Sequence, residues 1–129
     1  PLYMAAQKGH AEIVQQLVDA SADVNKAPTD EAGATPLCAA ASAGHTAIVK
    51  LLIDGNASID TARSLGGETP LYISVRKGHA EIVQQLVDAR ADVNKASSSS
   101  GSTPTFIAAQ GSHLDILQIL TDAGGRTSA

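Results

Sequence analysis

Apolar residues recur along the chain in short groups with helical spacing, and a polar stretch follows each group. The clearest group has apolar residues at i, i+1, i+4 and i+5, namely Ile13, Val14, Leu17 and Val18. This spacing places them on one stripe of a helix. A shorter apolar segment such as CAAASA at 38–43 precedes each group, and a polar segment such as ADVNKASSSSGS at 91–102 separates the pairs. The pattern predicts pairs of short helices joined by a turn and separated by loops.

The pairs are copies of one unit. Residues 8–27 and 77–96 are identical except at Ser21 and Arg90, and a more divergent copy begins near residue 43. Prolines mark the units and a histidine follows each proline nine residues later: Pro1 and His10, Pro36 and His45, Pro70 and His79, Pro104 and His113. A two-helix unit cannot bury its own stripe, so the copies must stack. We predict a single domain over 1–129, with repeats at about 1–27, 28–61, 62–96 and 97–129.

Residues with special backbone preferences mark the ends of the first helix in each unit. A threonine stands before a proline at three unit starts, Thr35, Thr69 and Thr103. This order is typical of an N-cap hydroxyl followed by proline at the first helical position. A glycine follows the first helix in three units, Gly9, Gly44 and Gly78, where a left-handed residue would end the helix.

Composition excludes several classes of function. The chain has nine basic and thirteen acidic residues and a net charge of −4, which argues against nucleic-acid binding because that requires clustered Lys and Arg. No run approaches the ~18 apolar residues that span a membrane, and the first ten residues lack the layout of a signal peptide. The single Cys38 cannot form an internal disulfide, so we expect a reducing, cytoplasmic location.

Candidate chemistry is sparse. The four histidines could suggest a metal row, but zinc ligands bind at ~2 Å whereas packed helices lie ~8–10 Å apart. The H-A-E sequences at 10–12 and 79–81 match half of a zinc-deaminase signature, and the cysteine half is missing. Cys38, the sequon at 56–58 and the serines at 97–100 are better explained as a packed residue, a helix cap and a solvated loop. We expect no catalytic residue, metal site or cofactor.

The repeats resemble the ankyrin family. The motifs that carry the resemblance are GATPLCAAASAGHTAIVKLLIDGNASID at 33–60 and GGETPLYISVRKGHAEIVQQLVDARADVN at 66–94. The resemblance implies an all-α solenoid of four stacked helix-turn-helix units with β-hairpin-like loops. The tetratricopeptide repeat shares the period of 34, but its Trp, Gly and Tyr signature is absent.

The chain departs from the family pattern at a few positions. The usual His after T-P-L is replaced by Tyr3, Cys38, Tyr72 and Phe106. The Gly expected after the second helix is replaced by Ser21, Asn56 and Arg90, and it is retained as Gly124. In the last unit Gly111 and Ser112 exchange the usual order and Thr105 replaces a leucine, so we expect a looser first helix there.

By resemblance, the concave face, built from loop tips and first helices, holds another protein. The sequence varies most at these positions, and we expect partner contacts at Thr29, Asp30, Glu31, Ala34, Ser42, Arg63, Ser64, Leu65, Glu68, Arg76 and Lys77. Two alternatives stay open: an ankyrin segment of a larger enzyme, channel or effector, and a structural spacer.

The ends of the array carry a further expectation. Pro1 lies inside a repeat, as in a piece of a longer array, so an apolar flank should be exposed at unit one. We expect weak end-to-end self-association through Leu2 or Val18. Four residues of the middle units should instead be fully buried by neighbours on both sides: Leu51, Leu52, Ile82 and Leu86.

Overall fold

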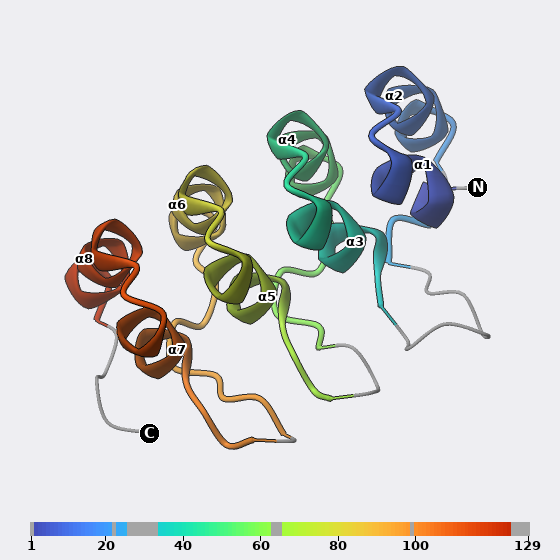
Figure 1. Ribbon diagram of the computed structural model, residues 1–129. Helices are drawn as coiled ribbons and strands as arrows, with labels where there is room; N and C mark the ends of the chain where they lie inside the picture. The colour runs from blue at the N-terminus through green and yellow to red at the C-terminus, as the bar shows by residue number, and fades with distance from the viewer. Residues whose placement is uncertain (1, 22, 26–33, 63–65, 99, 125–129) are drawn as a thin grey trace.

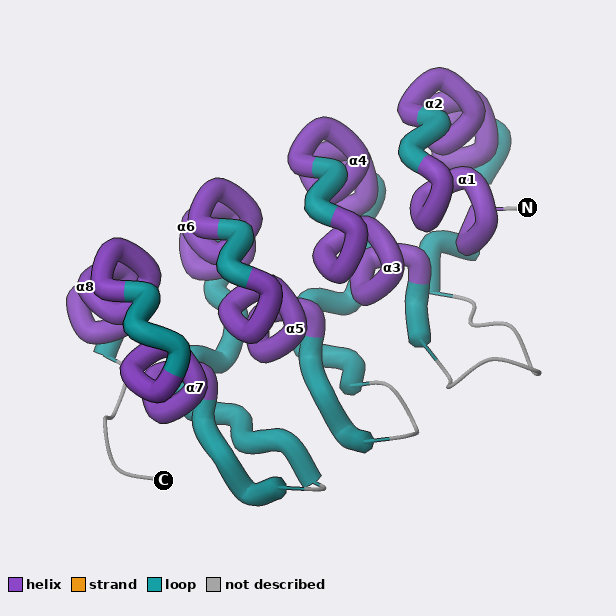
Figure 2. The backbone as a smooth tube through the Cα atoms, viewed as in Figure 1, coloured by secondary structure: helices purple, strands orange, loops and turns teal. Residues whose placement is uncertain are grey.

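The computed structural model describes residues 2–21, 23–25, 34–62, 66–98 and 100–124. Within these ranges the chain forms eight helices in four pairs: α1 (Leu2–Lys8) with α2 (Ala11–Asp19), α3 (Pro36–Ala43) with α4 (Thr46–Asp54), α5 (Pro70–Lys77) with α6 (Ala80–Asp88), and α7 (Pro104–Gln110) with α8 (Leu114–Asp122). Loops and turns connect them, and no strand occurs in the described part (Figure 2). The all-α prediction is confirmed.

The pairs stack into two layers of helices. α1, α3, α5 and α7 contact one another in order, and α2, α4, α6 and α8 do the same in a second layer, drawn above the first in Figure 1. The loops extend from the side of the first layer. We call the surface of α1, α3, α5, α7 and the described loops the first-helix face, and the surface of α2, α4, α6 and α8 the second-helix face.

Each predicted N-cap forms the expected hydrogen bond. The Thr35 hydroxyl accepts from the Cys38 amide at 3.3 Å, and Thr69 does the same for Tyr72 at 3.1 Å. Thr103 repeats the arrangement with the amide of Phe106 at 3.3 Å. The hydroxyl satisfies an amide that the first turn of a helix leaves without a partner, so it fixes where the helix starts.

Two of the histidines, His45 and His79, link their unit to the one before it. Nε2 of His45 lies 3.2 Å from the backbone oxygen of Gln7, and Nε2 of His79 lies 3.3 Å from that of Ser42. Because a carbonyl oxygen only accepts, each Nε2 carries the donated proton. The bonds join the turn of one unit to the end of the first helix in the previous unit.

Each of these two histidine rings also lies close to a glycine at the turn of the preceding unit. Gly44 has φ of +83°, and a Cβ added there would lie 3.0 Å from Cε1 of His79. Gly9 has φ of +84° and the same relation to His45, at 2.9 Å. A side chain at either position would meet both an unfavourable backbone conformation and a histidine ring.

Among the residues that the structure describes, four that are not glycine adopt left-handed backbone. Ser21, Asn56 and Arg90 have φ of 66°, 70° and 70° at the ends of the second helices. In the last unit Ser112, at φ 59°, takes the position that Gly78 holds one unit earlier. The preceding helix α7 ends at Gln110, one residue earlier in the repeat than α5, so the exchanged order shortens the first helix there.

The second-helix stripes pack with the buried residues of the first helices to form the core, and one predicted core residue needs correction. Leu52, Ile82 and Leu86 are fully buried, as predicted, but Leu51 is only half-buried. Leu51 occupies the repeat position of Gln85, beside the stripe and not on it. The prediction that Leu51 is buried from both sides was therefore wrong.

The described loop before α7 turns back on itself. The Ser97 amide donates to the Ser102 oxygen at 2.9 Å, and the Gly101 amide donates to the Ser97 oxygen at 2.7 Å. These two bonds close a hairpin-like loop without forming a strand.

Candidate protein-interaction face

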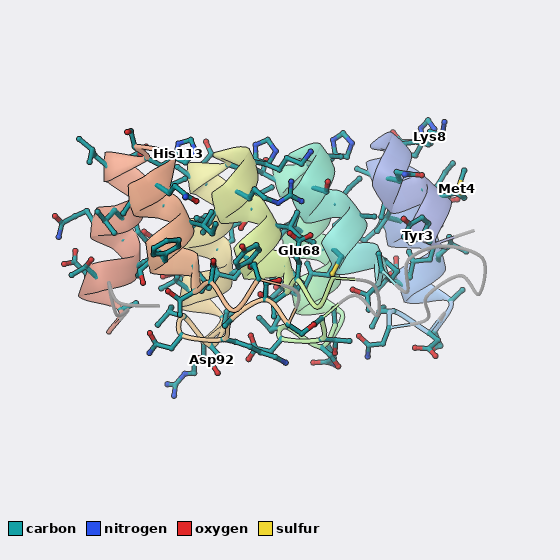
Figure 3. All side chains as sticks on the ribbon, turned by 60° about the horizontal axis from the view of Figure 1, so that its bottom comes forward. Tyr3, Met4, Lys8, Glu68, Asp92 and His113 are labelled. Atoms are coloured by element: carbon teal, nitrogen blue, oxygen red, sulfur yellow. The ribbon has the colours of Figure 1, made fainter. Side chains whose placement is uncertain are left out.

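The last turns of the first helices carry the exposed polar side chains of the first-helix face. Arg76 and Lys77 end α5 and are both exposed, and Gln7 and Lys8 hold the same positions at the end of α1. Figure 3 shows Lys8 at the edge of the stack where the helices turn, while Tyr3 of the same helix lies nearer the loops. The repeated helix end therefore presents a row of positions whose side chains differ from unit to unit.

An ion pair orders one of these side chains. Nε of Arg76 lies 3.1 Å from Oε2 of Glu68, and Nη2 lies 3.3 Å from Oε1. The Arg76 side chain is 43% exposed and that of Glu68 is 14% exposed. This two-pronged geometry fixes the guanidinium against the loop before α5, although an ion pair this open to solvent contributes little to stability.

The structure accounts differently for the eleven predicted contact residues. Six of them lie outside the described residues: Thr29, Asp30, Glu31, Arg63, Ser64 and Leu65. Arg76 and Lys77 are exposed, while Ser42 and Glu68 are half-buried. Ala34 is only 7% exposed and packs against Cys38 and Ile73. Ala34 therefore offers little surface of its own to a partner, and a partner contact there stays a prediction.

Charge is segregated between the two layers of helices. The first helices contain Lys8, Arg76 and Lys77 and no acidic residue. The second helices contain one base, Lys50, and these acids: Glu12, Asp19, Asp54, Glu81, Asp88, Asp115 and Asp122. The first helices are thus net basic within a chain whose net charge is −4, and the segregation was not foreseen from composition.

A hollow lies on the first-helix face over α3. Its volume is about 230 Å³. Its floor consists of residues that are at most 7% exposed, Ala34, Cys38, Ala39 and Ile73, and its rim is formed by Tyr3, Gln7, Ser42 and Ala43. Every lining residue comes from α1, α3, α5 or the chain just before α3. The floor is apolar and the rim is mostly polar.

The hollow exists because the second unit carries small residues where the others carry large ones. Cys38 and Ala39 stand where the other units have Tyr3 and Met4, Tyr72 and Ile73, and Phe106 and Ile107. At the end of the same helix, Ser42 and Ala43 stand where α1 has Gln7 and Lys8. Sequence reasoning missed the hollow, although alignment of the four units would have revealed the run of small residues.

The single cysteine lies in the interior of the stack. Cys38 is 1% exposed, and its Sγ lies 3.7 Å from the backbone oxygen of Thr61. No group of three or more His, Cys, Asp or Glu among the described residues is placed to hold a metal ion. None of the helices in the described ranges combines the length and apolar character needed to cross a bilayer.

The arrangement agrees with a comparison against protein families. The family model described as "Ankyrin repeats (3 copies)" matches residues 1–63 and 56–128, which together cover nearly the whole chain. The chain belongs to the ankyrin-repeat family. Ankyrin repeats are generally protein-interaction modules. A search of curated proteins found no match.

Proposed function

We propose that this ankyrin-repeat chain is a scaffold or adaptor that binds a partner protein on its first-helix face. The proposal rests on the positions at which the units differ from one another in sequence. The second helices of units one and three are identical and serve packing. One row of the first helices, exposed except at the half-buried Ser42, reads Gln7, Ser42, Arg76 and Gln110. Repeats that differ at their surface and agree in their core fit a face adapted to one partner.

The charge pattern supports the same face. A basic layer of first helices in an acidic chain attracts an acidic or neutral partner to that layer, because complementary potentials steer encounter and fix register. The second helices carry seven acidic side chains and one lysine and would repel an acidic partner. The described loops of the first-helix face add Asp23, Asp60, Glu68 and Asp92 and the base Lys95, so the basic charge of that face belongs to its helices. The proposal therefore includes the orientation of the partner as well as the surface that it contacts.

The proposal also includes a reducing location, such as the cytoplasm, which suits the single buried thiol of Cys38.

The test is a paired variant of α5. Arg76→Gln with Lys77→Glu removes both positive charges, and glutamine is the residue that Gln7 and Gln110 place at the first of these positions. Glutamine also avoids placing a second carboxylate against Glu68. We expect the free energy of unfolding to change by less than about 1 kcal/mol. Capture of a stoichiometric partner from native lysate should fall markedly.

The control is Gln84→Glu, an exposed substitution on α6 of the second-helix face. Denaturant melts of all three proteins accompany the capture experiment. Loss of capture in Gln84→Glu with full capture in the α5 variant would contradict the proposed face. Failure of the wild-type chain to retain any partner would instead favour a structural spacer.

A further inference from the structure

We infer that the hollow over α3 receives one large apolar side chain from an extended partner segment that carries acidic residues on both sides of it. This inference rests on the proposed function and names the chemistry of the partner. It follows from three features of the first-helix face: the size and lining of the hollow, the basic residues that flank it, and the hydrogen bonds that fix its walls.

The size and lining select a single apolar side chain. A volume of about 230 Å³ is smaller than the ~300–1,000 Å³ of pockets that hold whole small molecules. The floor of Ala34, Cys38, Ala39 and Ile73 is already withdrawn from solvent, so an apolar side chain placed there would lose its contact with water. Such a buried anchor surrounded by a polar rim is the usual form of a binding hot spot.

The basic residues on either side of the hollow favour acidic residues on either side of the partner's apolar side chain. At the helix-end position, Lys8 of α1 and Lys77 of α5 lie on either side of Ala43, which belongs to the rim. No first helix contributes a carboxylate that would compete for these lysines. A segment crossing α3 therefore passes between two positive charges with its apolar residue midway.

The spacing of the acidic residues follows from the stacking of the units. Helices pack at interaxial distances of roughly 8–10 Å, so α1 and α5 are separated by roughly 16–20 Å across α3. An extended chain advances about 3.3 Å per residue. The two acidic residues should thus lie about two or three positions before and after the apolar residue.

The walls are held in place before any partner arrives. His45 binds the backbone oxygen of Gln7 on one side of the hollow, and His79 binds that of Ser42 on the other. Both acceptor residues belong to the rim. A preformed site loses less conformational freedom on binding, which favours affinity.

The test is a selection of short random peptides displayed on phage against the intact chain. We expect enriched peptides to share one large apolar residue with Asp or Glu two or three positions away on both sides. Synthetic versions of the strongest peptide are then titrated, with Ala in place of the apolar residue or with Asn and Gln in place of the acids. Each replacement should weaken binding by about tenfold or more.

Two variants fill the hollow with residues that the repeat itself uses. Ala39→Ile copies Ile73 and Ile107, and Ser42→Gln copies Gln7 and Gln110, so each introduces a side chain that the fold already accommodates. The control, Ala109→Val, copies Val75 at an exposed site on α7 away from the hollow. Both filling variants should weaken the peptide about tenfold or more while the control leaves it unchanged.

The outcomes separate this inference from the proposed function. If the enriched peptides respond to Arg76→Gln with Lys77→Glu but bind both filling variants normally, the hollow is not the site, although the first-helix face is. If the peptides respond to neither set of variants, the inference fails, and the capture experiment with the native partner decides the proposed function separately. Enrichment of basic or wholly polar peptides, or of no peptide at all, would overturn the inference about partner chemistry.

Discussion

At the residue scale, a glycine at the turn of each of the first three units lies close to the histidine of the next unit. Gly44 has left-handed backbone, and a Cβ there would lie 3.0 Å from the ring of His79. We expect Gly44→Ala to lower the free energy of unfolding by roughly 2–5 kcal/mol, because the left-handed conformation and the steric overlap both count against alanine. Urea denaturation measures the change.

The matched control for this prediction is Gly101→Ala. Gly101 also has left-handed backbone, at φ +72°, but nothing lies within 4 Å of its added Cβ. It should lose only about 1–2 kcal/mol, the cost of the backbone conformation alone. Equal losses at Gly44 and Gly101 would mean that the histidine ring moves aside without cost.

At the element scale, adjacent leucines of α4 separate the buried stripe from its border. Leu52 is 0% exposed, whereas its neighbour Leu51 is half-buried. We expect Leu52→Ala to cost about 2–5 kcal/mol through the cavity that it leaves, and to do so cooperatively because both neighbouring units pack on this helix. Leu51→Ala should cost no more than about 1.5 kcal/mol, because much of that side chain stays in water.

Both changes remove the same atoms from the same helix, so helix propensity cancels in the comparison. Chemical denaturation followed by circular dichroism gives the two free energies. Similar costs for Leu51 and Leu52 would show that the stripe is wider than the burial pattern indicates.

At the scale of the whole molecule, the N-terminal flank exposes residues that internal units bury. Ile13 is 45% exposed, whereas its equivalents Ile48, Ile82 and Ile116 are at most 1% exposed. Met4, in α1 of the same unit, is 49% exposed. The sequence predicts Leu2 and Val18 as the residues of this flank. In the structure Leu2 is buried and Val18 is half-buried, so both expose less apolar surface than Ile13 and Met4.

For the isolated 129-residue chain, this flank leads us to expect weak self-association at high protein concentration. Ile13→Glu should abolish it, because a charge would then have to be buried in the contact. Gln15→Glu adds the same charge at a neighbouring exposed site of α2 and should leave association unchanged. Light scattering over a concentration series measures the effect, and a monomer at millimolar wild-type protein would contradict the expectation. Head-to-tail contacts would give open chains, since such contacts need not close.

The sequence by itself determined the local features of this protein. Threonine N-caps, left-handed glycines and the helical stripes depend on backbone conformation and on neighbours within a few residues. The period of the copies then required stacking, which gave the all-α solenoid. Arg76 and Lys77 could also be assigned to the surface of a first helix, because they end its last turn.

Only the tertiary structure decided what each copy meets in the next. Residues 8–27 and 77–96 are almost identical, yet Ile13 is 45% exposed and Ile82 is 0% exposed. The same reason explains why Ala34 is buried against Ile73 of the following unit, and why Ala39 leaves a hollow between α1 and α5. Conformational preference belongs to a segment, but burial and cavities depend on the side chains that a neighbouring unit brings alongside it.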